Sequence, residues 1–383
     1  MMPSVWNSLG AGVLALVLVA QTVTTQACPK DPANPSSSDP FTTSDGVRFR
    51  VDTVATGLEG VPWAMEFAPD GRLFVTERLG LVLIVNVTTG TSEIALSLDG
   101  TFTESEAGML GLALDPQFSQ NHLVYIYVTQ RVGTTGAVNR ILRFREVNNR
   151  LGEMAVLLDG IPAAGIHDGG RLKFGPDGLL YATTGDAATQ GLAQDVSSLA
   201  GKILRINRDG TTPRDNRFSS PMYTYGHRNP QGIDWHPTAG TMWSSEHGNI
   251  GNDEINQIQS GLNFGWPRIQ GSESMPSMEA PLTSFSPAIA PSGAAFYRGG
   301  RIPQFTNNFF VATLRGTALL RVTVDSAGRR ITAQERLLEG GYGRLRDVVM
   351  GPDGNLYFVT NNRDGRGTPA QGDDRILRLA PAL

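Results

Sequence analysis

The stretch FGPDGLLYATTGD, residues 174–186, contains the pattern from which we infer the architecture. A Pro-Asp-Gly turn joins an apolar residue to a strand in which apolar and polar residues alternate, as in a β-hairpin. The pattern recurs as FAPDGRLFVTE at residues 67–77 and as MGPDGNLYFVTN at residues 350–361. The sequence therefore predicts a series of similar hairpins.

The spacing of the turns indicates how many units the chain holds. Two and then three units of roughly 55 residues separate Pro69, Pro176 and Pro352, a period typical of propeller blades. Weaker copies of the pattern bring the total to six: Leu114–Thr129, Trp235–Glu246 and Ile302–Leu314. We therefore predict an all-β fold, a six-bladed β-propeller with four-stranded antiparallel blades, over a β-sandwich with coincidental turns.

The two ends of the propeller domain are expected to meet. A strand over residues 47–54 is predicted to pair with one over residues 375–379, which would close the ring and hide both sheet edges.

Composition agrees with this fold and excludes one class of partner. The 383 residues include 45 glycines and 23 prolines, which interrupt short runs rich in Val, Leu, Ile, Phe and Tyr. The formal net charge is −4 and no block of Lys and Arg is present. We therefore expect no nucleic acid partner.

The N-terminus has the features of an export signal. The run LGAGVLALVLVA at residues 9–20 has the length of a signal-peptide apolar segment and is short for a membrane span. We predict a signal peptide over residues 1–27, a Pro/Ser/Asp-rich linker over 28–44 and the propeller over 45–383. The protein is then exported, periplasmic or secreted, with no transmembrane domain in its mature form. Two alternatives stay open: an uncleaved anchor, and a lipid attached to the single cysteine, Cys28.

Residues 223–266 carry the densest set of polar groups in the chain. Three of the five histidines lie there among Gly, Asn and acidic residues. Arg228 and Asn229 offer planar donors, and the run from Glu246 to Asn249, which includes Gly248, offers oxygens suited to a hard cation such as Ca²⁺. An anion and a metal could therefore share this loop.

Loops of other blades supply further candidates, because a propeller gathers loops from all its blades at one end. His167, followed by two glycines, is a candidate general base, and Glu106 precedes a Gly-rich strand. Arg344 and Arg346 lie two positions apart, so on one strand they would point the same way and could grip a carboxylate together, with Arg315 nearby. Each of these residues could instead have a purely structural role, in a turn or on a solvent-exposed strand face.

Seven motifs in one order make a family resemblance recognisable. They are PWAMEFAPDGRLFVTER, GMLGLALDP, HDGGRLKFGPDGLLYATTGD, GKILRINRDG, YGHRNPQG, EHGNIGNDEIN and NFGWP. From about Gly57 to Leu379 the chain resembles the soluble, pyrroloquinoline-quinone (PQQ)-dependent sugar dehydrogenases of the glucose/sorbosone dehydrogenase family. Because Glu106 stands where the glucose branch has Gln, it resembles the aldose-sugar branch more.

The resemblance implies an enzyme that oxidises aldose sugars at the anomeric carbon to lactones, with PQQ and Ca²⁺ as cofactors. His167 would match the base, and Arg228 the arginine beside the quinone oxygen. Asn229 would orient the cofactor. The main-chain oxygens of Gly248 and Asn249 would match the carbonyls that bind Ca²⁺, which polarises the reacting carbonyl.

Three further matches follow from the same resemblance. Glu106 would lie near the base and the sugar. Arg344 and Arg346 would match the pair that holds the quinone's carboxylates, and Arg315 would stand where the family has Lys. The implied partners are an aldose sugar and an unidentified electron acceptor.

Departures from the family pattern limit what is carried over. Asn249 stands where Pro is frequent, and Phe264 replaces a Tyr of a second Ca²⁺ site that also uses an acid matching Glu254. We therefore do not assume that site or the dimer associated with it, so the presence of a second Ca²⁺ site stays open, as do monomer and homodimer. Residues 272–293 carry one aromatic, Phe285, where the glucose enzymes cover the sugar with several, which implies a more open mouth.

Two rival functions use the same fold. A partner-binding propeller such as the module of hedgehog-interacting proteins need not catalyse, and it would not need His167, Arg228 and the two arginines together. A lactone-hydrolysing propeller would share Ca²⁺ but need no quinone.

Overall fold

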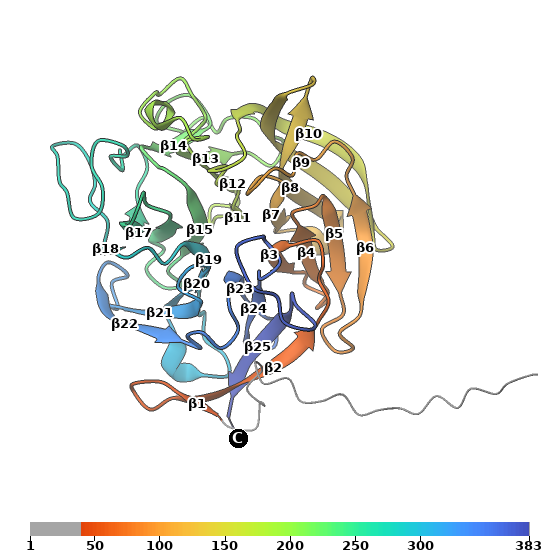
Figure 1. Cartoon of the computed structure of the whole chain (residues 1–383). Helices are drawn as coiled ribbons and strands as arrows, with labels where there is room; N and C mark the ends of the chain where they lie inside the picture. Colours follow the sequence, from red (N-terminus) through yellow and green to blue (C-terminus); the bar gives the residue numbers. More distant parts are fainter. Residues whose placement is uncertain (1–39, 383) are drawn as a thin grey trace, which may run out of the picture. The chain divides into compact units, whose positions relative to one another are not determined.

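The computed structural model describes residues 40–382, in which β-sheets joined by loops and turns lie around a common centre (Figure 1). Five of the six sheets use consecutive strands, with the first strand innermost and the last at the rim. The first two sheets consist of β3 (Pro62–Phe67), β4 (Leu73–Glu77), β5 (Leu81–Val85) and β6 (Ser92–Ser97), and of β7 (Met109–Leu114), β8 (Leu123–Val132), β9 (Gly136–Val147) and β10 (Arg150–Pro162).

The next three sheets repeat this order. They consist of β11 (Leu172–Phe174), β12 (Leu180–Thr184), β13 (Lys202–Ile206) and β14 (Met222–Tyr225); of β15 (Pro230–Trp235), β16 (Met242–Glu246), β17 (Asp253–Ile258) and β18 (Thr283–Phe285); and of β19 (Pro291–Phe296), β20 (Phe309–Thr313), β21 (Ala318–Val324) and β22 (Ile331–Leu337). Helical structure in the described residues is limited to short turns: α1 (Phe118–Asn121), η1 (Gln190–Ala193) and η2 (Pro303–Phe305).

The sixth sheet joins the two ends of the domain. It runs in the order β23 (Leu345–Met350), β24 (Leu356–Thr360), β25 (Ile376–Pro381), β2 (Arg48–Ala55) and β1 (Phe41–Thr42). The pairing of β2 with β25 is antiparallel and aligns Val51 with Leu379. The predicted closure is confirmed, and so is the six-bladed all-β fold.

The Pro-Asp-Gly turns connect the innermost strand to the second strand, as predicted. In the turn after β11, Gly178 has a φ of 76° and its amide donates to the carbonyl of Gly175, while the Asp177 carboxylate accepts the amide of Leu179. Glycine adopts this left-handed conformation without the Cβ clash that other residues meet. The three turns therefore form by local chemistry, independently of the blade in which each lies.

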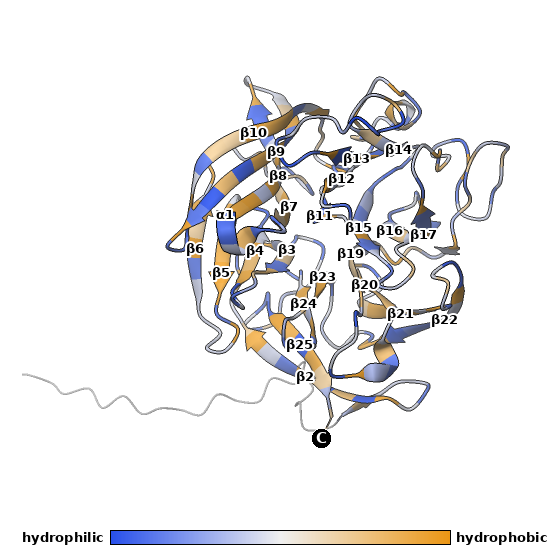
Figure 2. Ribbon diagram, turned by 180° about the vertical axis from the view of Figure 1, so that it is seen from behind, coloured by the Kyte–Doolittle hydropathy of each residue, from blue (hydrophilic) through white to orange (hydrophobic). Residues whose placement is uncertain are grey.

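Burial changes from the centre to the rim of each blade. All residues of the second strands β4, β12, β16, β20 and β24 are buried, whereas most residues of the rim strand β6 are exposed. Figure 2 shows the same change, with β4 and β5 mostly hydrophobic and hydrophilic stretches along β9 and β10. The hydrophobic side chains pack between neighbouring sheets, which ties each blade to the next.

The first described strand lies upstream of the boundary expected at Asp45. β1 pairs with β2, and Phe41 stacks on Phe49 with ring centroids 5.4 Å apart. Through this pairing and the stacked rings, the sheet extends into residues 41–42, which belong to the predicted linker. The predicted signal peptide and Cys28 lie outside the described residues, and within residues 40–382 no helix is long and apolar enough to cross a membrane.

The closing strand gives a stability prediction. Phe49 is 1% exposed and packs on Phe305, so Phe49→Ala should lower the free energy of unfolding by about 3–5 kcal/mol. Urea titration followed by tryptophan fluorescence measures the change. Ile94→Ala, which truncates a 52% exposed side chain on β6, is the control and should cost less than about 1 kcal/mol. Equal losses would contradict the assigned role of β2.

Candidate active site

The candidate residues lie at one end of the blades. His167, Arg228 and Arg344 precede the innermost strands β11, β15 and β23, and Gly248 follows the second strand β16. Because neighbouring strands are antiparallel, the start of an innermost strand and the end of a second strand lie at the same end of a blade. The Pro-Asp-Gly turns occupy the opposite end.

His167 is held by a carboxylate from the same blade. Its Nδ1 lies 2.8 Å from Oδ1 of Asp186, whose side chain is 1% exposed. Oδ2 of Asp186 accepts a hydrogen bond of 2.8 Å from Nε1 of Trp266. The contact through Nδ1 leaves Nε2 as the ring nitrogen that can exchange a proton with a ligand.

The backbone around His167 is tightly packed. His167 has a φ of 63°, and a Cβ on Gly185 would lie 1.8 Å from the His167 carbonyl oxygen. Only glycine leaves room for this approach, so Gly185 helps to fix the position of the histidine.

Arg228 and Asn229 tie the third and fourth blades together. The Arg228 carbonyl accepts the amide of Asp186 at 2.8 Å, and Oδ1 of Asn229 accepts the amide of Gly169 at 3.0 Å. The Arg228 guanidinium lies over the Trp266 ring, 5.4 Å from its centroid, and burial lowers its pKa. The two blades are thereby fixed relative to each other beside His167.

The loop after β16 is anchored by carboxylates. Glu246 accepts the Arg228 amide and contacts Nδ1 of His227 at 2.9 Å, and Oδ1 of Asp253 accepts the Gly248 amide at 2.8 Å. With the Gly248 amide held by Asp253, residues 248 and 249 form a loop whose backbone carbonyl groups are of the kind that can ligate a hard cation. Within residues 40–382 no group of three or more His, Cys, Asp or Glu side chains could hold a metal ion, so a metal here would depend on such carbonyls.

Glu254 and Phe264 lie beside this loop. Burial and the negative charge of Glu246 raise the pKa of Glu254 to about 8. Phe264 stacks on His227 with ring centroids 4.7 Å apart and offers no side-chain oxygen. The sequence leaves open whether a second Ca²⁺ site forms here, and these contacts do not test it.

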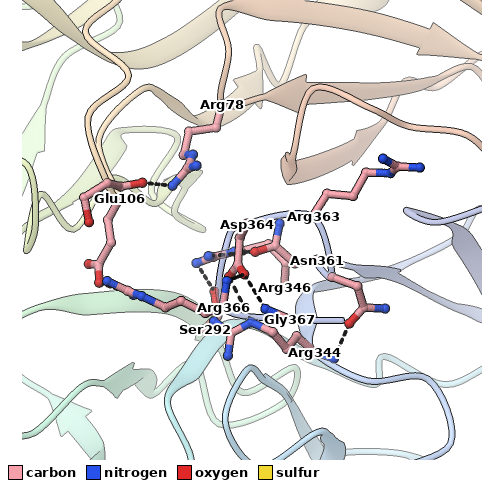
Figure 3. Close-up of polar contacts among 12 residues, drawn as sticks. Arg78, Glu106, Ser292, Arg344, Arg346, Asn361, Arg363, Asp364, Arg366 and Gly367 are labelled. Atoms are coloured by element: carbon pink, nitrogen blue, oxygen red, sulfur yellow. Dashed lines mark hydrogen bonds and ion pairs between the residues drawn. The ribbon is translucent and has the colours of Figure 1, made fainter. Parts of the chain in front are cut away.

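Glu106 lies beside His167, as the resemblance implies. Its Oε2 is 3.5 Å from the His167 amide nitrogen, and its Oε1 is paired with the Arg366 guanidinium (Figure 3). Burial opposes the charge on Glu106, but the positive charges of His247, Arg366 and His167 hold its pKa at about 2. Burial lowers the pKa of His247 to about 4, so at neutral pH Arg366 is the cation in contact with Glu106.

Arg344 and Arg346 do not lie two positions apart on one regular strand, so the argument that they point the same way does not apply to them. Arg344 precedes β23, and a bulge interrupts the register of β23 between Leu345 and Asp347. Arg344 forms an ion pair with Asp364 at 2.7 Å, whereas Arg346 contacts the side chains of neutral residues. Arg315 lies in the exposed turn after β20, and its side chain forms no ion pair within the described residues.

Several buried donors at this end have no partner in the described part of the chain. They are Nε of Arg78, Nη2 of Arg171, Nε of Arg228 and Nδ2 of Asn229; Nε2 of His247, a donor or an acceptor according to the tautomer, is also buried without a partner there. Unsatisfied buried donors cost about 1–3 kcal/mol each and are rare outside sites that receive a ligand. The donor set fits a flat ligand rich in carbonyl and carboxylate oxygens, which is the chemistry of a quinone with carboxylate groups.

Sequence reasoning missed Asp186, Asp364, Arg366 and Arg78. Asp186 is the last residue of the motif HDGGRLKFGPDGLLYATTGD, which begins with His167. A carboxylate at the end of the strand next to His167 was a signal that could have identified Asp186. The other three act across long sequence separations, which local patterns do not reveal. His236 packs on Phe296, and His122 contacts Glu146 at a surface turn.

Comparison with known proteins agrees with this geometry. The family model described as Glucose / Sorbosone dehydrogenase matches residues 60–377. The chain belongs to this family. It is therefore an oxidoreductase of the sugar dehydrogenase class, and the resemblance inferred from the sequence is confirmed.

Individual relatives span nearly the whole propeller. The structure of the PQQ-bound form of aldose sugar dehydrogenase from Streptomyces coelicolor is 38% identical, with a TM-score of 0.79 over 87% of this chain and 98% of that one. A glucose dehydrogenase-like oxidoreductase from Thermus thermophilus is 44% identical, with a TM-score of 0.79 over 86% and 99%. Aldose sugar dehydrogenase YliI of Escherichia coli is 30% identical over 79% of this chain and 88% of its own length.

The rival partner-binding family matches only in part. The human hedgehog-interacting protein is 29% identical over 50% of this chain and 32% of its own length. The sugar dehydrogenases cover more of the chain and of their own lengths.

The packing of Gly185 gives a prediction. Gly185→Ala should displace the His167 backbone and lower the free energy of unfolding by at least about 2 kcal/mol, because the new methyl group overlaps a carbonyl oxygen. Differential scanning fluorimetry measures the loss. Gly191→Ala, where a Cβ meets nothing within 4 Å, is the control and should change stability little. A Gly185→Ala protein as stable as wild type would contradict the close packing described.

Proposed function

We propose that the protein oxidises aldose sugars at the anomeric carbon to lactones, with PQQ and Ca²⁺ as cofactors and His167 as the general base. The observation that supports this proposal most strongly is the His167–Asp186 contact at 2.8 Å, beside buried donors that have no partner among residues 40–382. The relatives named as aldose sugar dehydrogenases, one of them in a PQQ-bound form, support the same choice of cofactor and substrate class.

The proposed chemistry needs a base and an electron acceptor. PQQ, when bound, supplies the two-electron acceptor for the hydride of the anomeric carbon, and Ca²⁺ on the carbonyls of Gly248 and Asn249 supplies a Lewis acid beside it. Nε2 of His167 takes the proton of the anomeric hydroxyl, so that loss of one proton and one hydride gives the lactone. Asp186 holds the ring in the required tautomer and stabilises the imidazolium that forms.

Arg228 and Asn229 have separate roles in this proposal. Arg228 presents a desolvated cation with an unpartnered Nε, suited to stabilise negative charge that develops on an oxygen of the bound quinone. Asn229 uses its Oδ1 to hold the Gly169 amide, so its Nδ2 is left to donate to a ligand and orient it.

Glu106 and the arginines complete the site. Glu106 lies close enough to the His167 backbone to accept a hydroxyl hydrogen from the sugar. Arg344, Arg346 and Arg315 supply the positive charge that attracts the carboxylates of the quinone. Electrons then pass to an acceptor that the site does not identify.

We also propose that the protein is exported. Residues 1–27 would be the signal, residues 28–44 a tether, and residues 45–383 the catalytic domain, in the periplasm or outside the cell. Cys28 could carry a lipid in place of simple release. Globomycin treatment of the producing cells separates these cases, since it blocks processing of a lipoprotein precursor but not of an ordinary one.

Dye reduction tests the proposed function. Purified apoprotein should reduce a redox dye with aldoses only when both PQQ and Ca²⁺ are added, and His167→Ala should lower kcat by about 10²–10⁴-fold. Equal rates with and without PQQ would contradict the proposal. No activity together with no PQQ binding would instead favour the partner-binding propeller.

The role of Asp186 has its own test. Asp186→Asn keeps the shape of the side chain but removes its charge, so kcat should fall at least about tenfold and the base should titrate at a lower pH. The pH profile of kcat measures both effects. Asp195→Asn, an exposed carboxylate in the same blade, is the matched control and should leave the profile unchanged. An unaltered profile in Asp186→Asn would contradict the assigned role.

The sparse aromatic content of residues 272–293 leads to a prediction about substrates. If few side chains cover the sugar, kcat/KM for an oligosaccharide should lie within about tenfold of that for its monosaccharide, because the added units extend from the mouth. Rates with glucose and maltotriose, measured side by side, check this. Strict selectivity for glucose would contradict an open mouth.

A further inference from the structure

Besides Arg363, four arginines lie where the loop between β24 and β25 meets the loops of the first and second blades (Figure 3). They are Arg78, Arg344, Arg346 and Arg366. Among residues 40–382, the carboxylates that form ion pairs with these four are those of Glu106 and Asp364. The four arginines therefore differ in whether their charge is already neutralised.

Arg344 and Arg366 are neutralised by the protein itself. Nε and Nη2 of Arg344 donate to Oδ2 of Asp364 at 2.9 and 2.7 Å, and Oδ1 of Asp364 accepts the amides of Arg366 and Gly367. Arg366 is paired with Glu106. Asp364 is 4% exposed, so the Arg344 ion pair is buried and its guanidinium is only partly available to a second carboxylate.

Arg346 has no charged partner among the described residues. Its guanidinium contacts the side-chain oxygens of Asn361, Gln231 and Ser292, and it lies over the Trp63 ring. Burial, together with the positive charges of Arg344 and Arg78, lowers its pKa to about 9, while the negative charges of Asp364 and Glu106 oppose this effect. The guanidinium stays protonated near neutral pH, so it is a rigidly held, buried cation without an ion-pair partner in the described part of the chain.

Arg78, in the turn between β4 and β5, is the second arginine without a carboxylate partner. Its Nη1 donates to the carbonyl oxygen of Ser105, and its Nε is buried with no partner among residues 40–382. A Cβ on Gly108 would lie 2.3 Å from Cγ of Arg78, so the backbone there leaves space for this side chain. The surrounding backbone therefore fixes the position of the Arg78 side chain.

Arg78 and Arg346 belong to the same electrostatic environment. Burial lowers the pKa of Arg78, and Asp364 and Glu106 oppose this effect, while the Arg78 charge in turn lowers the pKa of Arg346. Arg346 is buried and Arg78 is partly buried, so two positive charges that repel each other here are stabilised when an anion lies between or beside them.

We propose that Arg78 is a further cofactor-binding residue, which together with Arg346 holds a carboxylate of the bound quinone. Arg344, in contrast, is held by Asp364 and acts mainly by positioning the loop between β24 and β25. This inference rests on the proposed function. It changes the pair expected from the sequence, since the two uncompensated guanidinium groups come from different blades.

A carboxylate is the ligand that best fits two planar guanidinium groups, because each can donate two parallel hydrogen bonds to it. An acidic sugar also carries such a group, but Arg346 is 6% exposed, and at that depth we expect the cofactor rather than the sugar. The experiment includes an arm that separates the two sources.

The test is PQQ binding to the apoprotein in the presence of Ca²⁺, measured by isothermal titration, which needs no turnover. Arg78→Gln should weaken PQQ binding at least about tenfold, since charge-assisted hydrogen bonds are lost. The apoprotein should lose no thermal stability, because an uncompensated buried charge is removed. Arg78→Lys should recover part of the affinity. Arg363→Gln, which removes an equal charge from the adjacent loop but from a side chain whose Nε is bonded to the Asp373 carbonyl, should bind as wild type.

Each other outcome has a defined meaning. Unchanged PQQ affinity in Arg78→Gln, or an equal loss in Arg363→Gln, would overturn the inference. Unchanged PQQ affinity together with a selective loss of kcat/KM for glucuronate relative to glucose would assign Arg78 to an acidic sugar and also overturn it. Wild-type protein that binds no PQQ would overturn the proposed function itself.

Discussion

The antiparallel pairing of β2 with β25 is the constraint on which the rest of the structure depends. It links the two ends of the domain within one sheet and so fixes the ring in which the six innermost strands face a common centre. His167, Arg228 and Arg346 come from three different blades, and their relative positions are set by this closure. A site of this kind has no local fold of its own, because each blade contributes one or two side chains and the ring brings them together.

Within that ring, the distribution of charge distinguishes structural residues from those available to a ligand. His227 and Glu246, and Arg344 and Asp364, contact each other inside the protein, whereas Arg171 pairs with Asp347 through Nη1 and its Nη2 is buried without a partner among the described residues. Arg346 has only uncharged partners in the described part of the chain, and one donor on each of Arg78, Arg228 and Asn229 is buried without a partner there. A fold that buries donors in this way is destabilised until a ligand provides acceptors, so ligand binding and stability are expected to be coupled.

The sequence predicted the architecture well because the signals are local. The Pro-Asp-Gly turns, with glycines such as Gly178 at positive φ, form from a few adjacent residues, and their period gives the blade count. The residues of the site were found through ordered motifs, and the structure brings Glu106, His167 and Asn229 to one end of the propeller. The partners of those residues were not found. Asp364 and Arg366 act through contacts between remote loops, and the bulge in β23 separates Arg344 from Arg346 in a way that strand alternation does not anticipate.

A crystal structure of the protein with PQQ and Ca²⁺ tests the central claim most directly. The account predicts PQQ at the centre of the ring, with Arg228 and Asn229 within hydrogen-bonding distance, Nε2 of His167 facing its reactive carbonyl across the space for a sugar, and Ca²⁺ on the carbonyls of Gly248 and Asn249. PQQ bound elsewhere on the propeller, or a centre that stays free of PQQ at saturating concentrations, would contradict it.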